Sequence, residues 1–137
     1  MTSIKKIRLL FLLGIFALSS CEVDTFSLES FGCEEVFELL EEQATFKGGD
    51  LALNQFFADN IVYPQEAIDN EIEGRVIIKF VIDKQGVVHS PIVLRDIGGG
   101  CGAETIRVAN MMPDWNPGLS RGEPECMWIT IPVEFKL

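Results

Sequence analysis

The clearest pattern along the chain is the alternation of apolar and polar residues from Cys126 to Leu137. Apolar side chains occupy every second position of this stretch: Met127, Ile129, Ile131, Val133, Phe135 and Leu137. A period of two predicts a β-strand with one face against a core. Trp128 and Thr130 would then lie on the opposite face of the strand.

Two further runs rich in β-branched residues lie between Gly74 and Asp96, on either side of a turn signal from Asp83 to Gly86. Two such runs around a turn predict an antiparallel hairpin. Pro91 interrupts the second run and favours an edge strand or a bulge there, because proline has no amide hydrogen to donate.

Helical periodicity marks other stretches of the chain. Residues 51–61 carry one apolar stripe, residues 65–70 predict a short helical turn, and residues 102–112 predict a second main helix. The order helix, strand, strand, helix, strand predicts an α+β fold. The simplest arrangement is a small three-stranded antiparallel sheet of order 2-1-3, with two helices packed on one face and the last strand at an edge.

Basic residues and then an apolar run open the chain: two lysines precede residues 7–18, which only Arg8 interrupts. A transmembrane helix needs roughly 20 apolar residues, whereas a basic start and a shorter run are typical of a signal peptide. The sequence Leu-Ser-Ser-Cys that follows resembles the lipobox of bacterial lipoproteins. The resemblance implies a lipoprotein signal peptide at residues 1–20 and lipidation of Cys21. A plain signal peptide or an uncleaved anchor is the alternative.

The rest of the chain is strongly acidic. The leader holds three of the 11 basic residues and no acidic one, which leaves 8 basic against 21 acidic residues. Such a surface repels phosphate backbones, so we expect no nucleic-acid partner. Residues 21–46 contain eight acidic residues and no basic one. They predict an acidic tether with a short amphipathic helix at 34–43, ahead of a folded domain at 47–137; a solvated charged linker is the alternative.

Three cysteines follow Cys21, and an exported chain can oxidise two of them to a disulfide. All three pairings among Cys33, Cys101 and Cys126 are open from the sequence. The pair Cys33–Cys126 is favoured, because strand alternation points Cys126 off the core face and Cys33 lies in the segment that would cover that face. With one histidine and no CxxC motif, the chain offers no set of metal ligands, and we expect no metal or cofactor.

Cys101 lies near the start of the second main helix, where the helix dipole can lower the pKa of a thiol. A redox thiol at this position is the one route to an enzyme. No second cysteine follows at CxxC spacing and no histidine or lysine lies nearby in the sequence. A structural cysteine is therefore favoured, and the chain is predicted not to be an enzyme.

An ordered set of residues between positions 45 and 137 resembles the C-terminal domain of the TonB family. The set comprises Tyr63-Pro64 with Ala67, Gly74, Gly86 in the hairpin, Trp115 with Pro117, and the closing apolar strand. The resemblance implies a periplasmic domain that binds a peptide segment of an outer-membrane TonB-dependent transporter. Such partners add a strand to a sheet edge, with main-chain hydrogen bonds supplying affinity. We therefore expect the site along the last strand: Met127, Trp128, Ile129, Thr130, Ile131 and Val133.

Family members that transmit energy have a transmembrane helix and commonly a Pro-rich spacer, and this chain shows neither. We therefore expect a lipid-anchored binding module that faces the periplasm from the inner or outer membrane, with a transporter or another envelope protein as partner. The alternative is an accessory or structural envelope lipoprotein that keeps the fold without energy transduction. An occluded edge, or a homodimer through that edge, would favour the alternative.

The sheet face away from the helices is predicted to expose an apolar patch of three residues: Ile77, Val81 and Trp128. Exposed patches of this kind often mark interfaces. The alternative is that the acidic tether covers this face with its own apolar residues: Val36, Phe37 and Leu40.

Overall fold

The computed structural model describes residues 30–137. The predicted signal peptide at 1–20 and the predicted lipidation site Cys21 lie outside the described residues.

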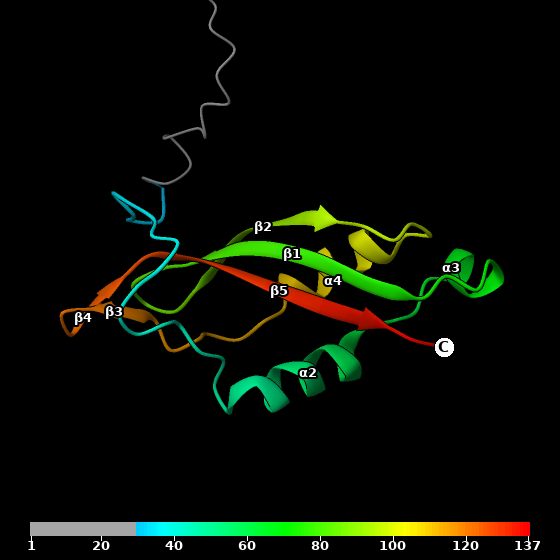
Figure 1. The fold of residues 1–137 in the computed structure, drawn as a ribbon, viewed down its shortest axis with the longest axis horizontal. Coiled ribbons are helices and arrows are strands. Elements are labelled where there is room, and N and C mark those ends of the chain that lie inside the picture. Colours follow the sequence, from blue (N-terminus) through cyan, green and yellow to red (C-terminus); the bar gives the residue numbers. More distant parts are fainter. Residues whose placement is uncertain (1–29) are drawn as a thin grey trace, which may run out of the picture.

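Three strands form one antiparallel sheet in the order β2-β1-β5. They are β1 (Gly74–Ile82), β2 (Val88–Arg95) and β5 (Met127–Phe135). The predicted α+β fold and its strand order are confirmed, with the first strand in the centre (Figure 1). The predicted irregularity around Pro91 is also present, because β2 is an edge strand whose register with β1 shifts twice.

The helices supply the other layer of the fold. They are α2 (Gly49–Asn60), α3 (Gln65–Asp69) and α4 (Cys101–Ala109). Four side chains of β1 point into the core and have no exposed surface: Val76, Ile78, Phe80 and Ile82. They share this core with Phe57 of α2 and Val108 of α4, so both main helices cover the same face of the sheet. Burying each such side chain contributes about 1.5–3 kcal/mol.

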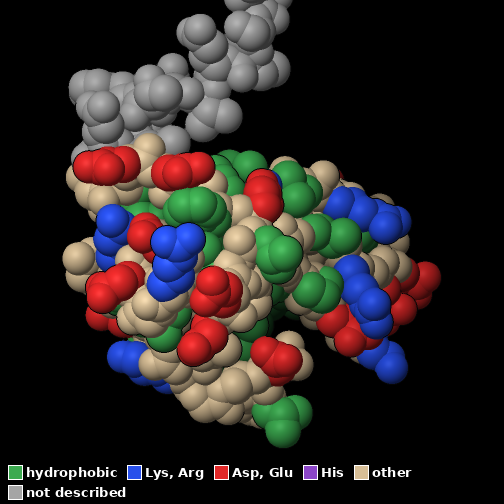
Figure 2. All heavy atoms as spheres, turned by 60° about the vertical axis from the view of Figure 1, so that its left-hand side comes forward, with side chains coloured by type: hydrophobic (Ala, Val, Ile, Leu, Met, Phe, Trp, Pro, Cys, Tyr) green, Lys and Arg blue, Asp and Glu red, His purple; other side chains and the backbone are tan. Residues whose placement is uncertain are grey.

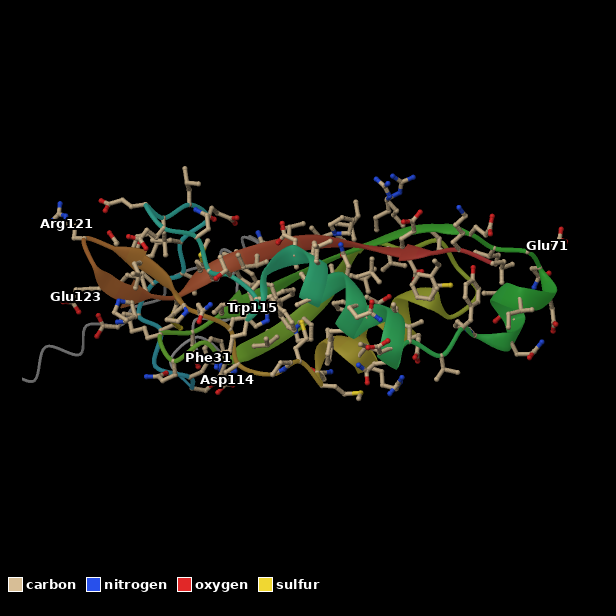
Figure 3. The ribbon with its side chains drawn as sticks, turned by 90° about the horizontal axis from the view of Figure 1, so that it is seen from below. Phe31, Glu71, Asp114, Trp115, Arg121 and Glu123 are labelled. Atoms are coloured by element: carbon tan, nitrogen blue, oxygen red, sulfur yellow. A yellow bond between two sulfur atoms is a disulfide. The ribbon has the colours of Figure 1, made fainter. Side chains whose placement is uncertain are left out.

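A second, two-stranded sheet was not predicted from the sequence. Strands β3 (Gly118–Ser120) and β4 (Glu123–Glu125) form a hairpin at one end of the molecule. Its two loop residues, Arg121 and Gly122, both have positive φ angles (52° and 78°), which suits the twist of a tight hairpin. In Figure 3, Arg121 and Glu123 lie at the tip of this hairpin, at the opposite end of the molecule from Glu71.

Residues 34–43 do not form the predicted helix. They belong to an extended segment, residues 33–46, here called the arm. The arm makes isolated bridges to three residues of the C-terminal part of the chain: Asn116, Leu119 and Met127. It is not a free tether, because Leu40, Ala44 and Phe46 are buried in the core.

The sequence of the arm explains the missing helix. Glutamates at 34, 38 and 42 would stack like charges at i,i+4 spacing, which disfavours a helix. In the extended form these charges spread over the surface, while the backbone bonds to neighbouring strands. Figure 2 shows acidic side chains gathered at the end of the molecule that carries the arm and the β3–β4 hairpin.

Two residues of the TonB-like pattern, Gly86 and Trp115, meet in the structure. The Trp115 amide donates a hydrogen bond to the Gly86 carbonyl (N···O 2.7 Å). Gly86 has φ +87°, and a Cβ there would lie 1.9 Å from the Trp115 carbonyl oxygen. The indole is 4% exposed and packs edge-on against Phe46 and Phe80 (Figure 3). Only glycine therefore lets the hairpin turn meet the backbone that positions this core tryptophan.

Replacing Gly86 by alanine is expected to destabilise the fold by roughly 2–5 kcal/mol. A left-handed alanine costs about 1–2 kcal/mol, and overlap with a packed neighbour adds about 1–3 kcal/mol. Urea unfolding measures the loss. Gly122→Ala is the matched control, because Gly122 has φ +78° but nothing within 4 Å of an added Cβ. Equal losses for the two variants would contradict the close approach to Trp115.

Candidate functional site

The candidate site is the outer edge of β5, because β1 pairs with only one side of that strand. The Trp128 amide points outward and donates to the Phe37 carbonyl (N···O 2.8 Å). Inward and outward backbone groups alternate along a strand, so Thr130, Pro132 and Glu134 also present theirs outward. Among residues 30–137, no hydrogen bond reaches these three outward positions. The open edge thus offers the amides of Thr130 and Glu134, and only a carbonyl at Pro132.

The arm occupies the first part of the same edge. Phe37 donates its amide hydrogen to the Cys126 carbonyl (N···O 2.9 Å) and accepts one from Trp128. The side chain of Met127 is fully buried in the core. Of the predicted edge residues, those from Thr130 to Val133 therefore lie beside the open edge, whereas the amide of Trp128 already has a partner.

The predicted exposed patch does not form. Val81 has no exposed surface, because Phe31, Val36 and Trp128 pack around it together with two cysteines. The alternative, a cover supplied by the N-terminal segment, is correct for Val36. It is wrong for Phe37 and Leu40, which pack on the helix side of the sheet because the arm crosses its edge.

Further contacts hold the arm and the residue Phe31 before it over this face. Lys79 lies with its ammonium 4.8 Å from the centre of the Trp128 ring and pairs with Glu38 of the arm (N···O 2.6 Å). Phe31 stacks on His89, with ring centroids 4.2 Å apart. The apolar surface that stays exposed on the sheet lies on β2, at Ile92 and Leu94.

A disulfide joins Cys33 of the arm to Cys126, with the two Cα atoms 6.0 Å apart. This is the pairing that the sequence favoured. Both cysteines are buried, and the bond spans 93 residues of sequence. The disulfide therefore ties the arm to the residue directly before β5.

Removing the disulfide in a Cys33→Ser, Cys126→Ser double variant is expected to lower the free energy of unfolding by about 2–5 kcal/mol. Closing so long a loop restricts the unfolded chain strongly, and the loss falls in the range seen for native disulfides. Urea unfolding with and without reductant measures it. The reductant should destabilise the wild type but leave the variant unchanged; an equal response from both would contradict the assignment.

The structure argues against a reactive thiol at Cys101. Its side chain has no exposed surface. Burial raises the pKa of the Cys101 thiol, and the nearby Asp96 carboxylate raises it further. Both effects oppose formation of the thiolate, which is the nucleophilic form. The residue is a packed structural cysteine.

A groove of about 690 Å³ lies between α2 and the C-terminal half of β5. Leu53, Asn54, Phe57, Ala58 and Ile61 line it from α2 and the residue that follows the helix. Residues 131–136 of the edge strand and its end line the other side. The open backbone edge of β5 and this groove are therefore parts of one site.

A helix-backed antiparallel sheet with one half-open edge defines a class of small α+β domain that can take an added strand. The family model of the Gram-negative bacterial TonB protein C-terminal domain matches residues 59–137. This is more than half of the chain, and the chain belongs to that family. Family membership supports a transport-related binding module of the bacterial cell envelope and is consistent with a chain that is not an enzyme.

Among solved structures, the chain is similar to the solution structure of the Helicobacter pylori TonB C-terminal domain. The two share 20% sequence identity, with a TM-score of 0.45. The match covers 63% of this chain and 90% of the other. No curated protein matches this chain in sequence.

Within residues 30–137, none of the helices is both long and apolar enough to span a bilayer. The same residues contain no group of three histidine, cysteine or acidic side chains that could hold a metal ion.

Proposed function

We propose that this protein binds an extended peptide segment of an outer-membrane transporter by strand addition to β5. The observation that carries the proposal is the open edge from the Trp128 carbonyl to Glu134, bordered by a groove. An unpaired strand edge is a template for another extended chain. The arm supports this reading, because the same edge already takes an extended segment at Phe37.

The number of available bonds predicts modest affinity. A peptide antiparallel to β5 exchanges two hydrogen bonds with Thr130 and two with Glu134, and it donates one to the Pro132 carbonyl. Each such bond contributes about 0.5–1.5 kcal/mol net. Much of this is offset by the cost of ordering the peptide and of association.

The second candidate is an accessory envelope lipoprotein that keeps the fold without transporter binding. The half-occupied edge at Phe37 and Trp128 is the observation that favours it. In that case the remaining edge pairs with another copy of the chain. Analytical ultracentrifugation separates the two, because only this candidate gives a dimer that edge variants dissociate.

Thr130→Pro is expected to weaken peptide binding by up to about tenfold, because it removes one hydrogen bond of about 0.5–1.5 kcal/mol. The fold should be kept, because the Thr130 amide serves no partner within the sheet. Proline is tolerated where a strand's amide faces solvent, and Pro132 is such a case in the same strand. Thr130→Val is the matched control, which keeps the amide and should bind like the wild type. NMR titration with peptides from the periplasmic segment of a TonB-dependent transporter measures both. Equal binding by the two variants would exclude strand addition at this edge.

The membrane attachment that we propose rests on the lipobox-like sequence before Cys21. Mass spectrometry of the protein extracted from membranes should find a mature N-terminus at Cys21 carrying acyl groups. Cys21→Ala should remove that mass and release the protein from the membrane fraction. An intact Met1 without acyl mass would show instead that the apolar run at 7–18 is retained.

A further inference from the structure

The arm attaches to the rest of the molecule in two unequal parts. Its second part, residues 40–46, is here called the root. Three apolar side chains of the root are buried in the core: Leu40, Ala44 and Phe46. The backbone of the root also exchanges two hydrogen bonds with each of two residues, at N···O distances of 2.8–3.1 Å: Asn116 and Leu119. These contacts hold the root in place without help from the disulfide.

The first part of the arm, together with the residues just before it, is here called the strap and comprises residues 30–38. Leu39, with 79% of its surface exposed, separates the strap from the root. Within the strap, Phe37 shares two backbone hydrogen bonds with the edge strand, and its side chain is only partly buried. The ion pair of Glu38 involves a side chain that is 70% exposed, and exposed ion pairs stabilise little. The strap is thus attached less firmly than the root.

The disulfide closes the strap over apolar surface of the sheet. Both sulfurs lie with Val81 and Trp128 in one small cluster, and Phe31 and Val36 of the strap pack against it. Because residues of the strap itself help to cover the buried disulfide, a motion that lifts the strap also exposes the bond. The same motion returns the Trp128 amide to the open edge of β5.

We propose that the disulfide between Cys33 and Cys126 is a redox switch. Its reduction releases the strap, while the root and the rest of the domain stay folded, and the open edge of β5 then begins at Trp128. This proposal rests on the proposed strand addition, whose regulation it describes. In the oxidised protein the strap is an internal competitor for the edge, and in the reduced protein it is not.

The reductant that the switch needs is a dithiol, either a small molecule or a thiol–disulfide oxidoreductase. One thiolate of the dithiol attacks a sulfur of the protein, and the S–S bond breaks as a mixed disulfide forms. The second thiolate of the dithiol then displaces the protein sulfur. The protein gains two electrons and two protons and holds two thiols, and the dithiol becomes a disulfide.

Amide hydrogen exchange of the full chain, followed by NMR with and without dithiothreitol, tests the release of the strap. Reduction lowers the stability of the whole domain, so all protection factors should fall. The protection factor of the Trp128 amide should fall at least about tenfold more than those of Asn116 and Leu119, because local opening of the strap adds to the general loss. Equal falls at the three amides would overturn the proposal, because they would mean that the strap does not open separately from the root.

Two cysteine variants control for other effects of dithiothreitol. The Cys33→Ser, Cys126→Ser double variant should show the low protection of the Trp128 amide whether or not dithiothreitol is present. Cys101→Ser is the matched control, because it removes a buried thiol that is not part of the disulfide. This variant should respond to dithiothreitol like the wild type. A response that is lost in Cys101→Ser and kept in the double variant would overturn the proposal.

Titration with a peptide from the periplasmic segment of a TonB-dependent transporter tests the effect on binding. The reduced protein should bind at least about fivefold more tightly, because the edge gains the Trp128 amide and the Cys126 carbonyl as two further hydrogen-bonding groups. If both forms bind equally, redox control is overturned and strand addition stands. If neither form binds, strand addition fails and the control of binding fails with it, while the exchange rates still decide whether reduction opens the strap.

Discussion

The structure depends on one constraint, that the backbone groups at the edges of a three-stranded sheet need partners or protection. β1 satisfies its own on both sides, so β2 and β5 become the edges. Edge β2 is made irregular by Pro91 and by Ser90, which has φ +52°. Edge β5 is closed by the arm as far as Trp128 and interrupted by Pro132. Most of both edges is therefore unsuited to pairing with another extended chain. The short free stretch of β5 after Trp128 is the part that can still pair.

Much of the fold could be predicted because local patterns and the global arrangement agree. The alternation from Cys126 onward predicts a strand, and the turn at Gly86 predicts a hairpin. The helix between the hairpin and the last strand returns the chain so that this strand pairs with β1, which gives the order β2-β1-β5. The candidate site was expected on the last strand because the family resemblance implies strand addition and the predicted topology leaves that strand at an edge. The contact between Gly86 and Trp115 joins positions far apart in sequence, so the pattern showed both residues but not their meeting.

The arm could not be predicted because its interactions are tertiary. Its apolar residues recur with helical spacing, but tertiary contacts override such weak propensity. They divide between two faces of the sheet: Val36 packs with Val81, whereas Leu40 joins the core under the helices. A periodicity argument assigns one face to such a segment and therefore predicted a helix wrongly. The patch was predicted from strand alternation, which does not show that another segment covers the face. The β3–β4 strands have three residues each, too few for any period to be visible.

Under the proposed strand addition, few hydrogen bonds would give weak binding in free solution. The proposed attachment to a membrane changes what such weak binding can achieve. Two partners held in the same envelope meet at an effective concentration set by their tethers, which reaches millimolar for short ones. Under the proposed anchoring, a short edge between the arm and Glu134 is then sufficient for occupancy and still allows rapid release. A longer open edge would bind more tightly but would also recruit any extended chain. Under the proposed strand addition, the disulfide-held arm thus lowers affinity by shortening the open edge and keeps that edge from pairing with unrelated extended chains.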